Sequence, residues 1–495
     1  MSRLYDTIVN AGQIWSEYEA CLDTHAKMGI EEDTVRAYRF YEGDQWYGLE
    51  SENEELPIYN FIAPLVKYKT AMVAMNEMSI NFSAPILNER MQKICAGLSR
   101  IAAQRWEHLK MDTRCWEIVK AAMISGDSYV YFYDGDGSCQ VLERTDLFLG
   151  DESNPDISAQ PYIIIRERRA VKDIRAEAER NGVSKEIAMT ILPDEDESDY
   201  GRDKCISLLR LSLTDGNLHF SRSTKSVVYQ PEQVIEGLGC YPIASLICSR
   251  KRGTARGAGE VTPLIPNQIE INRNLARRLI NAKMTAYSRL IYAGDRIANP
   301  RALTEVGTAI EVEGTSVGSV KDAVGYLTPS PMAPDAKALS EELLITSRQL
   351  AGAGDASLGN IDPTKASGTA IVAVRDQAAI PLNEQTAAFK RLVEDIARIW
   401  YRQWIVYNPD GITLPDGQMV SAAELECAAP DIRVDVSNTS PFSKYAREQA
   451  LSNLFSMGHL SFEEYVSALD DDSSAPKSRL EQIIKSRGGE GNADN

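Results

Sequence analysis

Histidine, long apolar runs and metal-binding spacings are all scarce in this chain of 495 residues. Its four histidines are isolated, and none of its eight cysteines belongs to a Cys-x-x-Cys pair, so a zinc site has little support. We therefore expect no cofactor and no metal, and cysteines that are small buried residues in a reducing cytoplasm. The longest apolar runs, such as residues 162–165 and 243–248, are far too short to span a bilayer. Because residues 1–10 lack the apolar core of a secretory signal, the protein is expected to stay soluble where it is made.

Positive charge is also in deficit, with 53 lysines and arginines against 71 acidic residues and a net charge of -18. Phosphate binding needs a local excess of cations, so this balance argues against a protein that grips nucleic acid over its whole surface. It leaves open a protein that encloses DNA without holding it tightly. The composition is otherwise that of a globular chain, and a length of roughly three domains predicts several segments.

The first half of the chain predicts helices followed by antiparallel strands. Apolar residues recur at three-to-four spacing through most of residues 1–124, which predicts helices with short breaks. A β-hairpin is predicted where residues 129–133 and 139–142 flank the turn-forming residues 134–137. The acidic run at residues 193–199 is expected to be a solvated loop. Further short elements are predicted as strands at 162–165, 206–213 and 226–229 and a helix at 170–181.

Basic residues gather in one stretch of this acidic chain. Between Arg250 and Arg289, nine lysines and arginines are opposed only by Glu260 and Glu270, so nine minus two gives +7. If these side chains contact a DNA backbone or another acidic partner, the contact is expected to be salt-sensitive and indifferent to base sequence. An ion pair with a neighbouring subunit is an equal alternative. The candidate residues are Arg250, Lys251, Arg252, Arg256, Arg273, Arg277 and Arg278.

Two strong helices are predicted in the second half, at residues 262–288 and 334–351. The first is apolar over more than half of its circumference, which predicts packing on several sides. A strand is expected between them at residues 309–312. The long helical pattern at residues 369–407 contains Pro381, where a kink is expected. Short strands near 412–436 and a helical tail complete the chain.

The segment at residues 352–368 joins two helical patterns but contains four glycines, which lower helix propensity. We expect a mobile loop, with a passive surface linker as the alternative. Its candidate contact residues are Gly352, Asp355, Ser357, Asn360 and Lys365.

Three catalytic or ligand motifs occur only in part. Residues 314–318 match Gly-x-Ser-x-Gly, and His459 lies downstream of Ser316, but no helical pattern follows directly as a hydrolase elbow requires. The run that starts at Asp134 lacks the glycine and the bidentate glutamate of a calcium loop. Residues 253–259 lack the Gly-Lys-Ser/Thr ending of a phosphate loop. The sequence therefore predicts a protein that is not an enzyme.

Five local patterns follow one another over nearly the whole chain. They are Tyr38-Arg39-Phe40-Tyr41-Glu42-Gly43-Asp44-Gln45-Trp46, Asn60 with the helix to Met75 and Ile80-Asn81-Phe82, Gly126-Asp127-Ser128-Tyr129-Val130-Tyr131, Gly259-Glu260-Val261-Thr262-Pro263-Leu264-Ile265-Pro266-Asn267-Gln268, and Ala366-Ser367-Gly368-Thr369-Ala370-Ile371. In this order they resemble the patterns of the portal proteins of tailed double-stranded DNA bacteriophages.

The resemblance implies an α+β, mostly helical subunit built from a wing, a stem, a clip and a crown around a central channel. The implied segments are a wing at 1–261 and 408–442, stem helices at 262–288 and 334–351, a clip at 289–333, a tunnel loop at 352–368, a long kinked helix at 369–407 and a crown at 443–495. The arc formed by Arg273, Arg277 and Arg278 would face the channel, a neighbouring subunit or the outer surface.

The resemblance also implies partners and a location. About twelve copies would close into a ring at one capsid vertex, through which double-stranded DNA is packaged and ejected. The terminase large subunit, a head-completion adaptor, and the major capsid and scaffold proteins would bind the ring. The implied location is the virion, and the host cytoplasm during assembly, with no membrane. The alternatives are a cytoplasmic structural scaffold unrelated to DNA and, more remotely, a serine hydrolase that uses Ser316.

Overall fold

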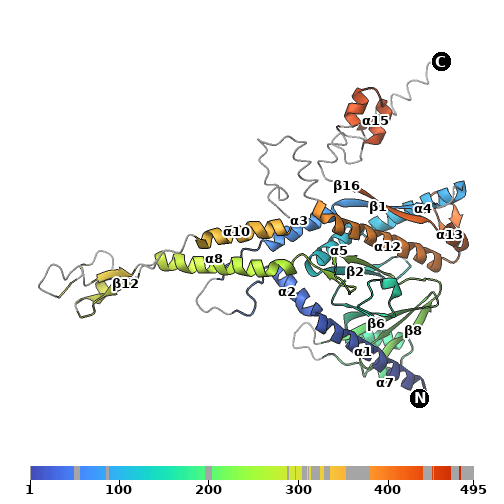
Figure 1. Cartoon of the computed structure of the whole chain (residues 1–495). Helices are drawn as coiled ribbons and strands as arrows, with labels where there is room; N and C mark the ends of the chain where they lie inside the picture. Colours follow the sequence, from blue (N-terminus) through green and yellow to red (C-terminus); the bar gives the residue numbers. More distant parts are fainter. Residues whose placement is uncertain are drawn as a thin grey trace. The chain divides into compact units, whose positions relative to one another are not determined.

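The computed structural model combines helices with antiparallel strands (Figure 1). It describes residues 2–49, 56–84, 88–135, 137–194, 203–286, 289–295, 297–303, 309, 311–313, 324–327, 335–352, 380–438, 449, 451–469 and 479–480. The chain divides into two compact units. The first comprises Met1–Ala37, Val66–Thr262 and Asp355–Asn495, and the second comprises Tyr38–Leu65 and Pro263–Gly354.

Most helices of the first unit come before or after its strands in the sequence. The helices are α1 (Ser2–Met28), α2 (Ile30–Glu42), α3 (Ile62–Ala74), α4 (Glu89–His108), α5 (Met111–Ser125), η1 (Ile157–Ala159), α6 (Val171–Arg180), α7 (Lys185–Ala188), η4 (Ile380–Leu382), α12 (Asn383–Tyr407), α13 (Ala422–Ala428) and α15 (Phe462–Ala468). Of these, α2 and α3 each contain a boundary between the two units.

The strands of the first unit pair only in antiparallel fashion among the described residues. One sheet has the order β4-β5-β6-β7-β8, a second has the order β3-β2-β9, and three more have two strands each. The strands are β1 (Asn76–Ser83), β2 (Asp127–Phe132), β3 (Cys139–Glu143), β4 (Leu147–Leu149), β5 (Ile163–Ala170), β6 (Lys204–Thr214), β7 (Asn217–Ser223), β8 (Val228–Ile235), β9 (Ile243–Ile247), β10 (Ser249–Arg250), β11 (Gly257–Ala258), β14 (Ile412–Thr413), β15 (Met419–Val420) and β16 (Asp431–Asn438).

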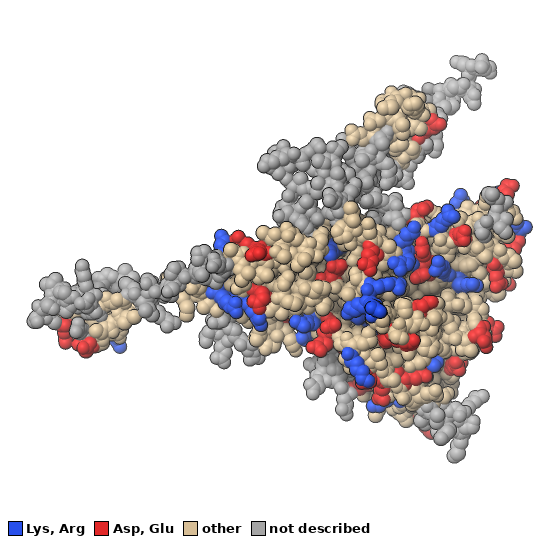
Figure 2. All heavy atoms as spheres, viewed as in Figure 1, with Lys and Arg blue, Asp and Glu red and all other residues tan. Residues whose placement is uncertain are grey.

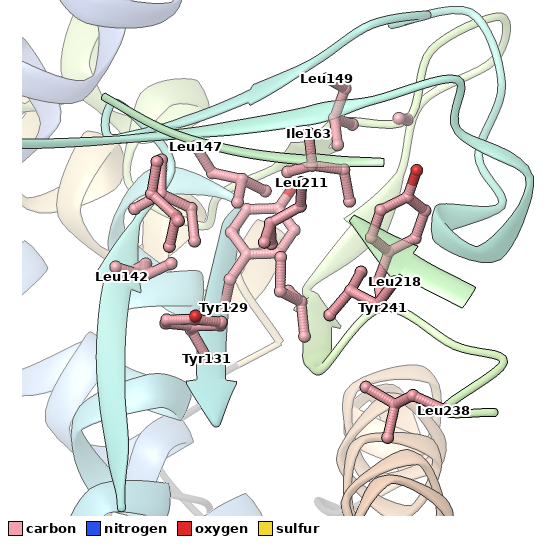
Figure 3. Packing of buried hydrophobic residues seen from close by; sticks show 14 residues of the cluster. Tyr129, Tyr131, Leu142, Leu147, Leu149, Ile163, Leu211, Leu218, Leu238 and Tyr241 are labelled. Carbon is pink, nitrogen blue, oxygen red and sulfur yellow. The ribbon is translucent and has the colours of Figure 1, made fainter. Parts of the chain in front are cut away.

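The core of the first unit lies between the three-stranded and the five-stranded sheets. Figure 3 shows Tyr129 and Leu142 from the smaller sheet close to Leu147, Ile163 and Leu211 from the larger one. These side chains are at most 2% exposed, so they form a close-packed apolar layer. The layer fixes the ends of β2 and β4, which carry the polar groups described below.

Helix α1 covers the opposite face of the five-stranded sheet. Ala11, Ile14, Tyr18 and Cys21 are buried at a spacing of three or four residues, which places them on one face of the helix. They pack against a buried set from the sheet, which is Phe148, Ile164, Leu208 and Val228. The same spacing continues to His25, which is also buried.

The second unit contains two antiparallel helices and a small sheet. Its elements after residue 262 are α8 (Ile265–Ala286), β12 (Arg289–Tyr292), η3 (Pro300–Leu303), β13 (Val324–Leu327) and α10 (Asp335–Leu350), and η2 (Thr262–Leu264) precedes them. Helices α8 and α10 lie side by side (Figure 1), and Asn267 near the start of α8 donates to Ser347 Oγ near the end of α10 at 2.9 Å. Strands β12 and β13 pair antiparallel between the two helices in the sequence.

Most elements predicted for the described residues are present, with two corrections. The helical pattern at 90–124 forms two helices, because Lys110 adopts a left-handed conformation with φ of 51° between α4 and α5. Among the described residues of 309–312, where a strand was predicted, there is a single bridge, from Val312 to Ile297. Pro381 lies in η4, directly before α12, and residues 369–379 lie outside the described part of the chain, so the kink expected at Pro381 stays a prediction. Six of the eight cysteines are buried as predicted, whereas Cys240 is half-buried and Cys427 is exposed.

Candidate functional site

Arg256 is the centre of a buried cluster of charges in the first unit. Its side chain is 1% exposed and donates to Glu152, from Nε at 2.8 Å and from Nη2 at 2.7 Å. Its Nη1 lies 3.2 Å from Asp127 Oδ2, and the carbonyl oxygens of Arg144 and Leu147 accept at 3.1 and 2.7 Å. The prediction that Arg256 contacts DNA or a partner is therefore corrected, since its guanidinium is buried and fully engaged within the first unit.

His25 joins this cluster from α1. Its Nε2 lies 3.0 Å from Glu152 Oε1 and 3.0 Å from Arg256 Nη2, and its ring stacks on Phe148. Burial lowers the pKa of His25, although the contact with Glu152 opposes this shift. Burial by itself would raise the pKa of Glu152, but hydrogen bonds from Arg256 and His25 outweigh it and hold that pKa at about 2. The cluster therefore contains a neutral histidine and an ionised glutamate near neutral pH.

Arg144 balances the charge of the cluster. Its Nε lies 3.4 Å from Asp127 Oδ1, and its Nη1 donates to the carbonyl oxygen of Ser125. Two guanidinium groups thus face two carboxylates, Asp127 and Glu152, with no net charge left over. A buried cluster of this kind costs several kcal/mol when one partner is removed, because the remaining charge is left without compensation. The ion pairs and hydrogen bonds of the cluster hold α1 and the two sheets together. The cluster contains no unpaired nucleophile or acid that could act on a substrate.

The glycines beside Arg256 allow close contact between backbones. A Cβ on Gly257 would lie 2.4 Å from the carbonyl oxygen of Gly126, and a Cβ on Gly259 would lie 2.4 Å from that of Ile124. Glu260 then donates its N–H to Met123 O at 2.8 Å. The glycine-rich piece is therefore a packing feature of β11 against the end of α5.

A second polar network lies at the start of α8, within the second unit. Gln268 is fully buried, accepts from the N–H of Phe61 at 3.2 Å and donates to the carbonyl oxygen of Tyr59 at 2.7 Å. Asn272 accepts from the N–H of Tyr59 at 3.0 Å and donates to Gln45 Oε1 at 2.6 Å. These amides thus fasten residues 45 and 59–61 to α8.

Asn60 extends this network to the preceding segment. Its Nδ2 donates to the carbonyl oxygens of Phe40 and Tyr41, at 3.3 and 3.0 Å, and Gln45 also donates to Phe40 O at 2.8 Å. Three of the five patterns that carry the resemblance, those that contain Gln45, Asn60 and Gln268, therefore meet in one hydrogen-bond network. The sequence alone did not indicate this meeting, because the three segments are distant along the chain.

The predicted basic residues of α8 are on its accessible side. Arg273 and Arg277 are exposed and Arg278 is half-buried, and Arg273 pairs with Glu270 at 2.8 Å. An exposed pair of this kind contributes little to stability. The three arginines remain candidates for a partner contact.

Arg250, Lys251 and Arg252 are exposed in the first unit, where Arg250 ends β10 and the other two lie in the loop between β10 and β11. The structure places Arg250 beside α12, where it lines two hollows together with Asp395. It was not predicted from the sequence that arginines of α12 lie near Arg250. The sequence does contain a pattern that could have shown a basic helix face, since Arg391, Arg398 and Arg402 recur at a spacing that places them on one side of a helix.

Apolar side chains remain exposed on the helices and the sheet of the second unit. Although α8 and α10 pack on each other, large hydrophobic residues of both, and of β12, are accessible. They are Met284, Ile291, Tyr292, Leu339, Ile345 and Leu350. These side chains are a candidate surface for contact with another molecule.

Several predicted site residues lie outside the described part of the chain. Of the predicted tunnel loop only Gly352 is described, in the left-handed region with φ of 71°, and Asp355, Ser357, Asn360 and Lys365 are outside. Ser316 is outside as well, and His459 is exposed.

Within the described residues no group of three or more His, Cys, Asp or Glu side chains is placed to hold a metal ion. None of the described helices is long and apolar enough to cross a membrane. Comparison with family models and with curated proteins finds no match for this chain.

Proposed function

We propose that this chain is the subunit of a portal ring, the conduit at one capsid vertex of a tailed bacteriophage through which double-stranded DNA is packaged and ejected. In this proposal α8 and α10 are the stem helices and the segment with β12 and β13 is the clip. The terminase and later the head-completion and tail proteins dock on the ring, and the protein itself has no catalytic role.

The observation that carries the proposal is the antiparallel pair α8 and α10 with exposed apolar side chains. Asn267 and Ser347 fix the antiparallel arrangement, and the β12–β13 sheet lies between the helices in the chain. Two helices alone leave part of each apolar surface in water, whereas neighbouring copies in a closed ring bury it. A ring also explains why an acidic chain with a net charge of -18 would let DNA pass without tight binding.

The polar networks support the same proposal. Gln45, Asn60 and Gln268 fasten the base of α8 to residues 40–61, and Gly126 and Gly257 allow β11 to pack closely against the start of β2. Each of these residues belongs to, or adjoins, a pattern that resembles the portal family. Their function here is to make a rigid subunit.

Light scattering of the purified chain tests the proposal. We expect a closed oligomer with a constant copy number over a wide range of protein and salt concentrations. A chain that stays monomeric in all of these conditions contradicts it. A fluorophosphonate probe tests the hydrolase alternative, and labelling that disappears in Ser316→Ala would favour that alternative instead.

A further inference from the structure

Helix α12 presents a stripe of arginines in the first unit. Arg391, Arg398 and Arg402 are exposed, and their spacings of seven and four residues place them along one face of the helix. Eleven residues separate the first from the last, which corresponds to about 16 Å along the axis. Figure 2 shows lysine and arginine side chains gathered over α12 and the chain beside it. We call these three residues the arginine stripe.

Two hollows lie beside the arginine stripe. One of about 380 Å³ is lined by Arg398 and residues of η1, and a smaller one of about 50 Å³ is lined by Arg391 and Glu384. Both hollows share Ser245 of β9, Arg250 and Asp395, so they are adjacent, and we call the two together the groove. Arg250 thus adds a fourth guanidinium to the same surface.

Most of this positive charge has no partner within the described part of the chain. Arg398 lies 3.4 Å from Asp395, whereas Arg250, Arg391 and Arg402 form no ion pair with a described residue. Burial raises the pKa of Asp395, against the opposing effect of Arg398. The side chains of Arg398 and Asp395 are 64% and 43% exposed, so contacts at this surface are expected to weaken as the salt concentration rises.

We propose that the arginine stripe and Arg250 bind the acidic run Asp194–Asp199 of a second copy of this chain. The inference rests on the proposed function, because it assigns one contact of the ring. The run has the sequence Asp-Glu-Asp-Glu-Ser-Asp. In extended conformation its five residue steps span about 16 Å, which matches the length of the stripe. Guanidinium groups are well suited to carboxylates, since they donate two parallel hydrogen bonds.

The start of the run is held in a fixed position. Asp194 donates its N–H to Lys204 O at 3.0 Å, and its Oδ2 accepts from the N–H of Ile206 at 2.7 Å. A fixed start limits the entropy lost when the run binds. Asp156, Glu384 and Asp395 also line the groove and oppose any acidic ligand, the run and a nucleic acid alike.

Binding of a labelled peptide tests this proposal with the whole chain carrying Glu195→Arg/Glu197→Arg, whose own runs no longer fill the grooves of neighbouring copies. The peptide covers residues 193–199, and its affinity is measured by fluorescence anisotropy at low salt. We expect saturable binding that falls at least tenfold in the double variant Arg391→Glu/Arg398→Glu. The matched control Arg273→Glu/Arg277→Glu, on α8, should leave peptide binding unchanged. No binding, or an equal loss in both variants, overturns the proposal, as does tighter binding of a DNA duplex that competes with the peptide.

A charge exchange separates this proposal from the proposed function. Arg391→Glu/Arg398→Glu should weaken assembly of the chain, and Glu195→Arg/Glu197→Arg in the same molecule should restore it. If the arginine variant forms rings normally, the proposed contact between the stripe and the acidic run is wrong, and the proposed ring is unaffected. If the unchanged chain is monomeric but binds the peptide through the stripe, the proposed ring is wrong, and the proposed contact is supported.

Discussion

Gly126 and Gly257 pack backbone against backbone in the first unit. A Cβ on Gly257 would lie 2.4 Å from the carbonyl oxygen of Gly126, and a Cβ on Gly126 would lie 2.5 Å from that of Gly257. Gly126 also has a φ of 118°, which other residues rarely adopt. The N–H of Gly257 donates to Asp127 Oδ1 at 3.2 Å, so the close approach places Arg256 next to its carboxylate partners.

Substitution of Gly257 by alanine should destabilise the protein. The added methyl group meets backbone, which moves less readily than a side chain, and overpacking of this kind costs about 1–3 kcal/mol. Urea unfolding measures the effect. The control is Gly12→Ala, because Gly12 lies in α1 with open space around it and alanine favours the helix. Equal stability of Gly257→Ala and the unchanged chain would show that the two backbones are further apart.

Removal of the Arg256 guanidinium should cost more. Arg256→Met leaves Asp127 and Glu152 buried with less compensation, and we expect a loss of about 3–5 kcal/mol in the free energy of unfolding. Arg252→Met serves as the control, since Arg252 is exposed in the same loop and its loss should change stability by at most about 0.5 kcal/mol. A similar small effect for both variants would contradict the buried cluster.

The cluster should make the protein sensitive to acid. The pKa of Glu152 is about 2 in the folded state against 4.5 ordinarily, so its contribution is complete above pH 4.5 and is lost as the pH falls toward 2. The pKa of His25 is lowered from 6.5, so the folded state also loses stability as the pH falls below 6.5. Urea unfolding from pH 8 to pH 3 measures this slope. In His25→Gln the part of the slope just below pH 6.5 should shrink, and an unchanged slope would count against the assigned role of His25.

Gln268 should hold residues 59–61 against α8. Gln268→Met removes the acceptor for Phe61 N–H and the donor for Tyr59 O, at a cost of about 1–3 kcal/mol for buried groups left without partners. Hydrogen exchange of the peptide that contains residues 57–62 should become faster. Gln349→Met, at an exposed position of α10, should leave this exchange unchanged. Equal protection in the two variants would mean that other contacts hold the segment.

The sequence predicted local elements well and the polar networks poorly. Residues Ala11, Ile14, Tyr18 and Cys21 recur at helical spacing, so α1 could be predicted from the sequence, whereas the burial of His25 was not predicted. Arg256 could not be separated from Arg250 and Arg252, because burial of a charge depends on Asp127 and Glu152, which are more than one hundred residues away. The same limit applies to Gln268, whose partners come from residues 59–61.

Electron micrographs of the purified whole chain test the central claim most directly. We predict ring-shaped particles with a central hole and one copy number, whose mass is a multiple of 54.8 kDa. Particles of a single 54.8 kDa chain, or open assemblies without a central hole, would contradict the account.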